Sequence, residues 1–306
     1  MTVITGWSAV SAHGRGRAAF LAGLGSTPAD PLVPDVPATP GQGGVRLDRA
    51  SLLALAALEE LVADVDTGDR AGLVLGTTSG SLHTEMEHMR SSLTEKRPHH
   101  LDPKTIPSGT MNCAAAQCAM RYGVTGPNTT LAGGTGAALH ALGYAARLLV
   151  ADRADTVLVG AVEESTPSRT AVEHAAHGVR PLGEGGAVVR LERAGGPRPV
   201  LAEVLATHGV LGPPETCATA LLRRAGLDRS DVWAVLGPVE GFPDAVTRRL
   251  PEPGLGDTGA ASGAFALATA LGRGEPGEHV LVLAHDADGT TAGALLRLAD
   301  STGEAQ

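Results

Sequence analysis

The chain has 306 residues, of which 43 % are hydrophobic and 19 % are charged, a composition typical of globular rather than disordered proteins. Its formal charge of −9 at pH 7, without clusters of basic residues, argues against a nucleic-acid partner, because binding to phosphates needs such clusters. Aromatic residues make up only 2 %, so we expect Ala, Val, Leu and close glycine contacts to fill the core.

The cysteines and the N-terminal segment set further limits. Cys113, Cys118 and Cys217 have no CxxC spacing, so they predict neither a disulfide framework nor a zinc site. The segment 1–10 lacks a basic leader and a long apolar core, and no apolar run approaches the ~20 residues of a membrane span. We therefore expect a soluble, cytoplasmic protein without a signal peptide, a metal site or a membrane partner.

The first half of the chain alternates strands and helices. Apolar runs predict strands, and helical periodicity predicts helices; the strands are expected at 1–10, 71–80, 125–133 and 154–164, and the helices at 17–24, 47–65, 108–123 and 136–149. Between these elements we expect a Pro/Gly-rich loop at 27–46 and a charged surface helix and loop at 80–108.

The second half repeats this order after a polar stretch at 165–185. Its expected strands are 185–194, 198–210, 231–242 and 278–289, and its expected helices are 215–227 and 255–274. Three segments mirror segments of the first half, namely 231–242 with 70–81, 255–274 with 131–149, and 278–289 with 154–164. The sequence thus predicts an α/β fold of two duplicated halves, at 1–165 and 186–306, with a connecting segment at 166–185.

The stretch "LAGGTGAALHALGYAARLL" at 131–149 is a site where an enzyme could hold a nucleophile. A glycine pair precedes Thr135, which lies just before or on the first turn of a long amphipathic helix. Unpaired amides and the helix dipole stabilise negative charge at such a position. A threonine hydroxyl is a weak acid, however, and needs an adjacent base to react. Thr135 is therefore either an activated nucleophile or a small residue in a tight turn.

Residues 122–167 resemble the core of the β-ketoacyl synthases of the thiolase superfamily. In that family a Gly-Pro dipeptide, a strand, a nucleophilic cysteine, a buried helix and a GG.E strand follow one another; here the matching parts are Gly126-Pro127, 128–132, Thr135, the helix from Gly136, and 160–163. The segments "GEGGAVVRLERA" and "GDTGAASGA" match further parts of the family in order. The resemblance implies a thiolase fold in a layered αβαβα arrangement.

The residues at the family's catalytic positions differ. The nucleophilic cysteine falls on Thr135, and the two histidines that stabilise the enolate fall on Leu236 and Asp257. Leucine cannot donate a hydrogen bond, and an ionised aspartate repels an enolate. The family's lysine falls on Glu252, and its FGFGG gating loop corresponds to "HDADG" at 285–289. The scaffold is retained, whereas each aligned catalytic residue is lost.

Such a chain resembles the chain length factor, the ketosynthase β subunit of type II polyketide synthases. The resemblance implies a non-catalytic subunit that forms a heterodimer with an active ketosynthase α subunit, helps to shape the polyketide tunnel, meets acyl carrier protein through the complex and needs no cofactor. Threonine replaces the glutamine that is usual at this position of the subfamily. Two alternatives stay open: a divergent acyltransferase or ketosynthase that uses Thr135 or Asp257, and a homodimeric acyl-binding scaffold.

The resemblance also implies which residues meet the partner. Family dimers pair the strand before the nucleophile turn across a twofold axis, and here that strand holds Thr129, Thr130, Leu131 and Ala132. On the preceding helix, four residues share a face by helical spacing: Met111, Ala115, Cys118 and Tyr122. This face either lines a tunnel for a growing acyl chain or packs into the chain's own core.

Three other patterns point to weaker hypotheses. A GxGxxG pattern at 254–259 follows "RRLPEP" instead of the strand that a dinucleotide site needs. The histidines and glutamates at 83–88 do not match HExxH, so a solvated surface is expected there rather than a metal site. Asp257 is expected to cap the following helix rather than to act as a relocated base.

Overall fold

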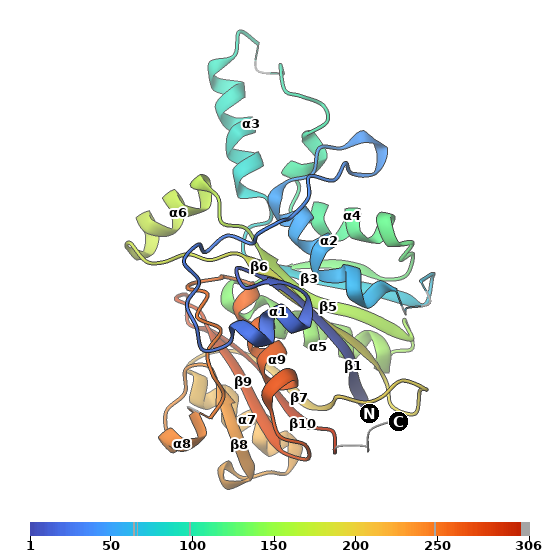
Figure 1. Cartoon of the computed structure of the whole chain (residues 1–306), viewed down its shortest axis with the longest axis vertical. Helices are drawn as coiled ribbons and strands as arrows, with labels where there is room; N and C mark the ends of the chain where they lie inside the picture. Colours follow the sequence, from blue (N-terminus) through green and yellow to red (C-terminus); the bar gives the residue numbers. More distant parts are fainter. Residues whose placement is uncertain (64, 66, 98, 248, 301–306) are drawn as a thin grey trace.

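One mixed β-sheet runs through the molecule (Figure 1). The computed structural model describes residues 1–300 except 64, 66, 98 and 248, and in this part of the chain the sheet has ten strands. Their order is β4-β3-β5-β6-β1-β7-β10-β9-β8, with β2 beside β1. The strands are β1 (Thr2–Ser11), β2 (Gly14–Arg15), β3 (Ala71–Thr77), β4 (Asn128–Ala132), β5 (Thr156–Glu163), β6 (Gly185–Arg193), β7 (Ala202–Leu211), β8 (Val232–Leu236), β9 (His279–His285) and β10 (Thr290–Leu298).

Helices cover the sheet and fill the space between its two halves. They are α1 (Gly16–Gly23), α2 (Arg49–Val62), α3 (Leu82–Thr94), α4 (Cys113–Tyr122), α5 (Ala137–Val150), α6 (Pro167–His177), α7 (Pro214–Ala225), α8 (Asp244–Thr247) and α9 (Ala261–Arg273). Short 3-10 turns lie at Gln42–Gly44, Ile106–Gly109, Gly134–Gly136 and Arg229–Asp231. Helix α3 projects from the body (Figure 1). None of the helices within the described residues is long and apolar enough to cross a membrane.

The strand order shows the duplication directly. From one end it reads β4-β3-β5-β6-β1, and from the other end β8-β9-β10-β7, so that β8, β9, β10 and β7 repeat β3, β5, β6 and β1. The two halves meet where Thr2–Ile4 of β1 pair with Ala202–Val204 of β7. This arrangement confirms the predicted fold of two similar α/β halves, while the exact boundaries at 165 and 186 stay a prediction.

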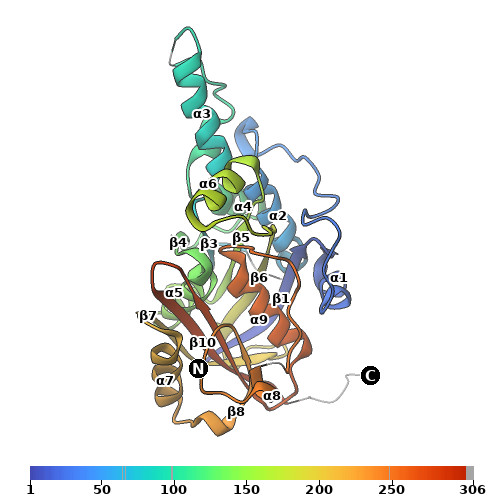
Figure 2. The same cartoon turned by 90° about the vertical axis from the view of Figure 1, so that its left-hand side faces the viewer.

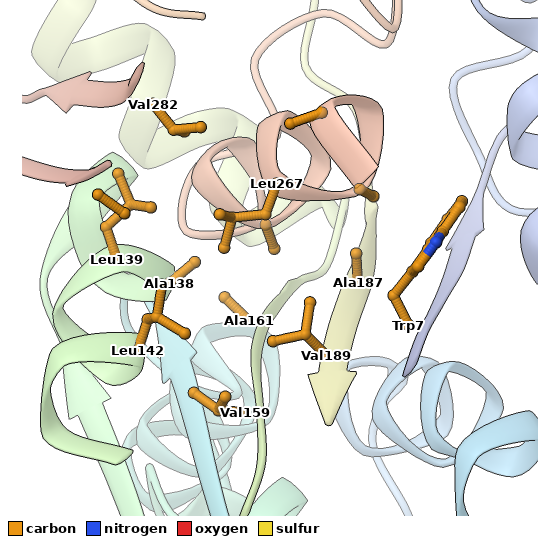
Figure 3. Close-up of a cluster of buried hydrophobic side chains, with 14 of the residues drawn as sticks. Trp7, Ala138, Leu139, Leu142, Val159, Ala161, Ala187, Val189, Leu267 and Val282 are labelled. Carbon is orange, nitrogen blue, oxygen red and sulfur yellow. The ribbon is translucent and has the colours of Figure 1, made fainter. Parts of the chain in front are cut away.

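The layers follow from where the apolar faces lie. Helices α5 and α9 form the middle layer, and their apolar residues pack against β5, β6 and β9, as the side chains in Figure 3 show. Helices α2 and α4 cover the outer face of the first half, and α7 covers that of the second half. The predicted αβαβα arrangement is therefore present.

One predicted helix begins later than its sequence pattern indicates. The periodicity predicts a helix from residue 108, but α4 begins at Cys113. Residues 106–109 instead form a 3-10 turn, which contains Pro107 and is followed by Thr110 in an extended conformation. Because the chain has left helical geometry at Thr110, Met111 lies before α4 and not on its face.

A buried carboxylate links the beginnings of α2 and α3. Glu164, at the end of β5, is 1 % exposed and accepts the backbone N–H of His83 at 3.3 Å and that of Ala50. Burial, together with the negative charges of Asp48 and Glu163, raises the pKa of Glu164 to about 7. The carboxyl group is thus half-protonated near neutral pH.

This raised pKa makes stability depend on pH. Between pH ~4.5 and ~7 the folded chain holds a proton on Glu164 that the unfolded chain releases, so the free energy of unfolding falls as pH rises through this interval. Glu164→Gln should remove the part of this fall that Glu164 contributes and stabilise the chain above pH ~7.5 by up to ~3 kcal/mol, as measured by urea unfolding. The exposed-site variant Glu95→Gln should keep the wild-type dependence; a wild-type profile in Glu164→Gln would contradict the assignment.

Candidate functional site

Thr135 lies in a tight turn between β4 and α5. The turn is a 3-10 helix at Gly134–Gly136, and Gly134 has a φ of +50°, which favours glycine. Strand β3 approaches closely, since a Cβ added to Gly76 would lie 2.9 Å from the backbone of Ala137. Thr135 therefore stands immediately before a long, largely buried helix, as its sequence predicts.

The polar groups of Thr135 are bonded to the turn between β9 and β10. Its backbone N–H donates to Oδ2 of Asp286 at 3.1 Å, and its hydroxyl donates to the carbonyl of His285 at 3.1 Å. The carboxylate of Asp286 lies against Gly134, where an added Cβ would overlap Oδ2. The segment 285–289, which the resemblance aligns with a gating loop, thus contacts the nucleophile turn through a negative charge.

Asp257 faces the same cleft as Thr135 and is paired with two arginines. Its Oδ2 lies 2.7 Å from Nη2 of Arg180, and its Oδ1 lies 3.7 Å from Nη2 of Arg169. Oδ1 also accepts the backbone N–H of Gly259 at 2.8 Å. The prediction that Asp257 caps the next helix needs correction, because Gly259 precedes α9 and the N-cap residue, Ala260, has no side-chain bond to an amide.

Ala260 is instead bonded to a carboxylate of the other half. Glu163 is 1 % exposed and accepts the N–H groups of Thr78 and Ala260, each at 3.2 Å. Burial raises the pKa of Glu163, and the nearby charge of Arg169 opposes this rise. The end of β5 is therefore fastened to the beginning of α9 beneath the cleft.

The remaining aligned positions lie elsewhere. The cleft is lined, among others, by Thr78, Thr135, Arg180, Asp257, Asp286 and Asp288. Leu236 ends β8, is 7 % exposed and packs in the middle-layer core, outside the residues that line this cleft. Glu252 lies in an exposed loop and lines a separate depression beside Phe265. The structure thus places Thr135 and Asp257 in one cleft, whereas Leu236 and Glu252 lie outside it.

Three of the four residues predicted on one helix face, Ala115, Cys118 and Tyr122, pack in the core cluster that contains α2. Met111 and Ala115 line a small cavity between α4 and β4, which we call the α4–β4 cavity, together with Thr77, Ser81 and Thr130. Cys118 is fully buried and packs against α2 in the chain's own core, where burial raises its pKa. The hydroxyl of Tyr122 donates to the carbonyl of Leu55 at 3.0 Å. Met111 therefore lies outside the predicted helix face, whereas Ala115, Cys118 and Tyr122 share a face that packs into the chain's own core.

Strand β4 forms one end of the sheet in the described part of the chain. It pairs with β3 on one side only, and its residues are half-buried or exposed. Thr129 and Leu131 are half-buried and Ala132 is exposed. Among the described residues, the buried hydroxyl of Thr130 has no hydrogen-bond partner. Such an edge offers a row of backbone groups to another strand.

The cleft offers little to a nucleophilic mechanism. The described hydrogen bonds connect the Thr135 hydroxyl to a backbone carbonyl and not to a basic side chain, and the carboxylate of Asp257 is neutralised by Arg180. Within the described residues, no group of three or more His, Cys, Asp or Glu side chains could hold a metal ion. Local sequence patterns do not predict the contributions of Asp286 and Arg180, although the segment "HDADG" in place of the gating loop marks the position of Asp286.

Comparisons with known proteins agree with this architecture. The family model for the N-terminal domain of β-ketoacyl synthases matches residues 38–194. The 3-oxoacyl-[acyl-carrier-protein] synthase 2 of Vibrio cholerae is 32 % identical over 114 residues, which is 36 % of this chain and 27 % of that protein. The putative polyketide β-ketoacyl synthase 1 of Streptomyces halstedii is 32 % identical over 187 residues, 48 % of this chain and 42 % of that protein. The matches thus span less than half the length of these curated relatives.

Solved structures match over the whole length. The structure described as the ishigamide ketosynthase/chain length factor superposes with a TM-score of 0.91 at 36 % identity, covering 97 % of this chain and 99 % of that one. A type II polyketide ketosynthase in complex with its acyl-carrier protein has a TM-score of 0.75 at 17 % identity, with 98 % and 99 % covered, and supports the fold alone. The chain therefore belongs to the β-ketoacyl synthase family of the thiolase superfamily.

Proposed function

We propose that this chain is a non-catalytic, chain-length-factor-like subunit of a cytoplasmic type II polyketide synthase. In this role it forms a heterodimer with an active ketosynthase, contributes to the acyl tunnel and meets acyl carrier protein through the complex. The predicted halves, 1–165 and 186–306, would then serve as a scaffold that no longer carries out condensation itself.

The main observation behind this proposal is the contact of Asp286 with the Thr135 amide. In acyl transfer, an amide at the nucleophile position stabilises the negative oxygen of the reacting group. Here that amide already donates to a carboxylate at 3.1 Å, and the Thr135 hydroxyl donates to a carbonyl. An oxyanion would have to displace a bonded negative charge, so this contact opposes catalysis at Thr135.

Two further features favour a subunit over an independent enzyme. Asp257 cannot act as a free base while Arg180 holds it at 2.7 Å, and its negative charge disfavours an enolate. The open edge of β4 and the adjoining α4–β4 cavity, lined by Met111, Ala115 and Thr130, are the places where a partner and an acyl chain would meet this scaffold. The relative described as the ishigamide ketosynthase/chain length factor supports the same subunit role by analogy.

The alkylation rate of a cysteine placed at position 135 should depend on the charge of Asp286. We expect Thr135→Cys to react slowly with iodoacetamide near pH 7.5, because the adjacent carboxylate raises the pKa of the new thiol. Adding Asp286→Asn should speed alkylation about tenfold, the effect of about one pKa unit, as followed by mass spectrometry. The native cysteines are buried, and burial raises the pKa of Cys217 to about 11, so their background is low.

The matched control is Thr135→Cys combined with Asp288→Asn. Asp288 lines the same cleft, but its carboxylate accepts the N–H of Thr290 and not that of Thr135. The control should therefore react nearly as slowly as the single variant. Equal rates for the Asp286 and Asp288 double variants would contradict a specific role of Asp286.

The subunit role itself is tested by co-expression with the ketosynthase encoded nearest to this chain's gene. We expect the two chains to co-purify as a heterodimer and the isolated chain to show no thioester turnover. A stable homodimer that does not bind the ketosynthase would favour the acyl-binding scaffold. Turnover by the isolated chain that Thr135→Ala or Asp257→Ala abolishes would favour a divergent acyltransferase and overturn the proposal.

A further inference from the structure

A wide groove lies between α5, β7 and α7, beside the end of β4. Its walls include Leu131 of β4, His140 and Arg147 of α5, Thr207 and His208 of β7, and Arg224 of α7. In Figure 2, α5, β7 and α7 lie on one side of the molecule, and α1 lies on the opposite side. We call this feature the α5–β7 groove.

The groove is cationic although the chain as a whole is acidic. None of the residues that line it is Asp or Glu, while the chain carries a net charge of −9. Arg224 is exposed and donates to the carbonyl of Thr207 at 2.7 Å, and Arg147 is exposed with its guanidinium 5.5 Å from the ring centre of Tyr144. Both guanidinium groups are thus positioned at the groove without a carboxylate among its lining residues.

The surroundings of the groove lower the pKa values of its two histidines. Burial lowers the pKa of His140, and burial together with the charges of Arg224 and Arg223 lowers the pKa of His208. Both rings are therefore neutral near pH 7, and the positive charge of the groove comes from arginine. Because arginine stays charged at all physiological pH values, the groove is cationic at any pH at which the protein works.

Part of β7 has no strand neighbour on one side. Strand β1 pairs with β7 only at Ala202–Val204, so beyond Val204 the described residues place no strand on that side of β7. The groove begins at Thr207, within this unpaired part. A polypeptide lying here would meet both arginines and the end of the β4 edge.

We propose that the α5–β7 groove receives an acidic segment of the partner subunit that pairs along β4. This inference rests on the proposed heterodimer and adds the chemistry by which that partner is chosen. A symmetric dimer presents the same surface patch from both copies. Since neither β4 nor the groove lining has a carboxylate, a second copy paired through this same patch would bring none to Arg147 and Arg224, whereas an acidic partner would.

Charge reversal tests the groove without touching the Thr135 cleft. Arg147→Glu/Arg224→Glu should weaken binding of the co-expressed ketosynthase at least about tenfold at low salt and reduce the salt dependence of the affinity. The matched control, Arg17→Glu/Arg273→Glu, changes two exposed arginines on α1 and α9 and should bind like the wild type. If the wild-type chain binds no ketosynthase, the proposed function fails as well. If wild type and groove variant bind equally, only the groove proposal fails.

Zero-length cross-linking identifies the occupant. The chain has only two lysines, Lys96 and Lys104, so Arg147→Lys and Arg224→Lys each add an amine against a small background. Carbodiimide treatment of the complex should join the new lysine to an Asp or Glu of the ketosynthase, as located by mass spectrometry. Cross-links of the new lysines to acyl carrier protein or to a second copy of this chain would overturn the proposal, as would cross-links confined to Lys96 and Lys104.

Discussion

A buried guanidinium group holds the two halves of the chain together at the cleft. Arg169, in α6, is 2 % exposed and donates to the carbonyls of Glu164, Gly183 and Asp257 at 3.1, 2.8 and 3.1 Å. A charge removed from water to this degree is tolerated only where polar partners surround it. The end of β5, the segment before β6 and the loop before α9 must therefore all be in place together. The geometry around Asp257 depends on this arginine.

Small residues allow the middle layer to form around that point. A Cβ on Gly263 of α9 would lie 3.2 Å from Leu139, and one on Gly143 of α5 would lie 3.0 Å from Thr207. The helices consequently approach each other and β7 more closely than larger side chains would permit. Three of the seven aromatic rings lie together: Phe20 stacks on Phe265 with centroids 5.5 Å apart, and Trp7 meets Phe20 edge-on. Close backbone contacts thus fill space in the core that aromatic side chains usually occupy.

Local patterns were enough to predict most elements and the duplication, but they did not predict helix α6 (Pro167–His177) or strand β10 (Thr290–Leu298). Apolar runs and glycine turns identify β3, β5, β8 and β9, and the glycine pair before α5 identifies the Thr135 turn. The same reasoning placed Met111 on a helix face with Cys118, which failed for Met111 because the 3-10 turn with Pro107 delays the beginning of α4. The bond between Thr135 and Asp286 joins residues 151 positions apart, so no local pattern could predict it.

That bond also explains how the Thr135 turn is stabilised. Amides at the beginning of a helix have no partner within the helix, and leaving such a donor buried and unbonded costs free energy. In an enzyme, this backbone N–H can instead donate to the oxygen of the substrate. Here Gly134 leaves space for the carboxylate of Asp286, which satisfies the amide and complements the positive end of α5. The turn is therefore stable as a structural element, and it fixes the end of β4 beside it.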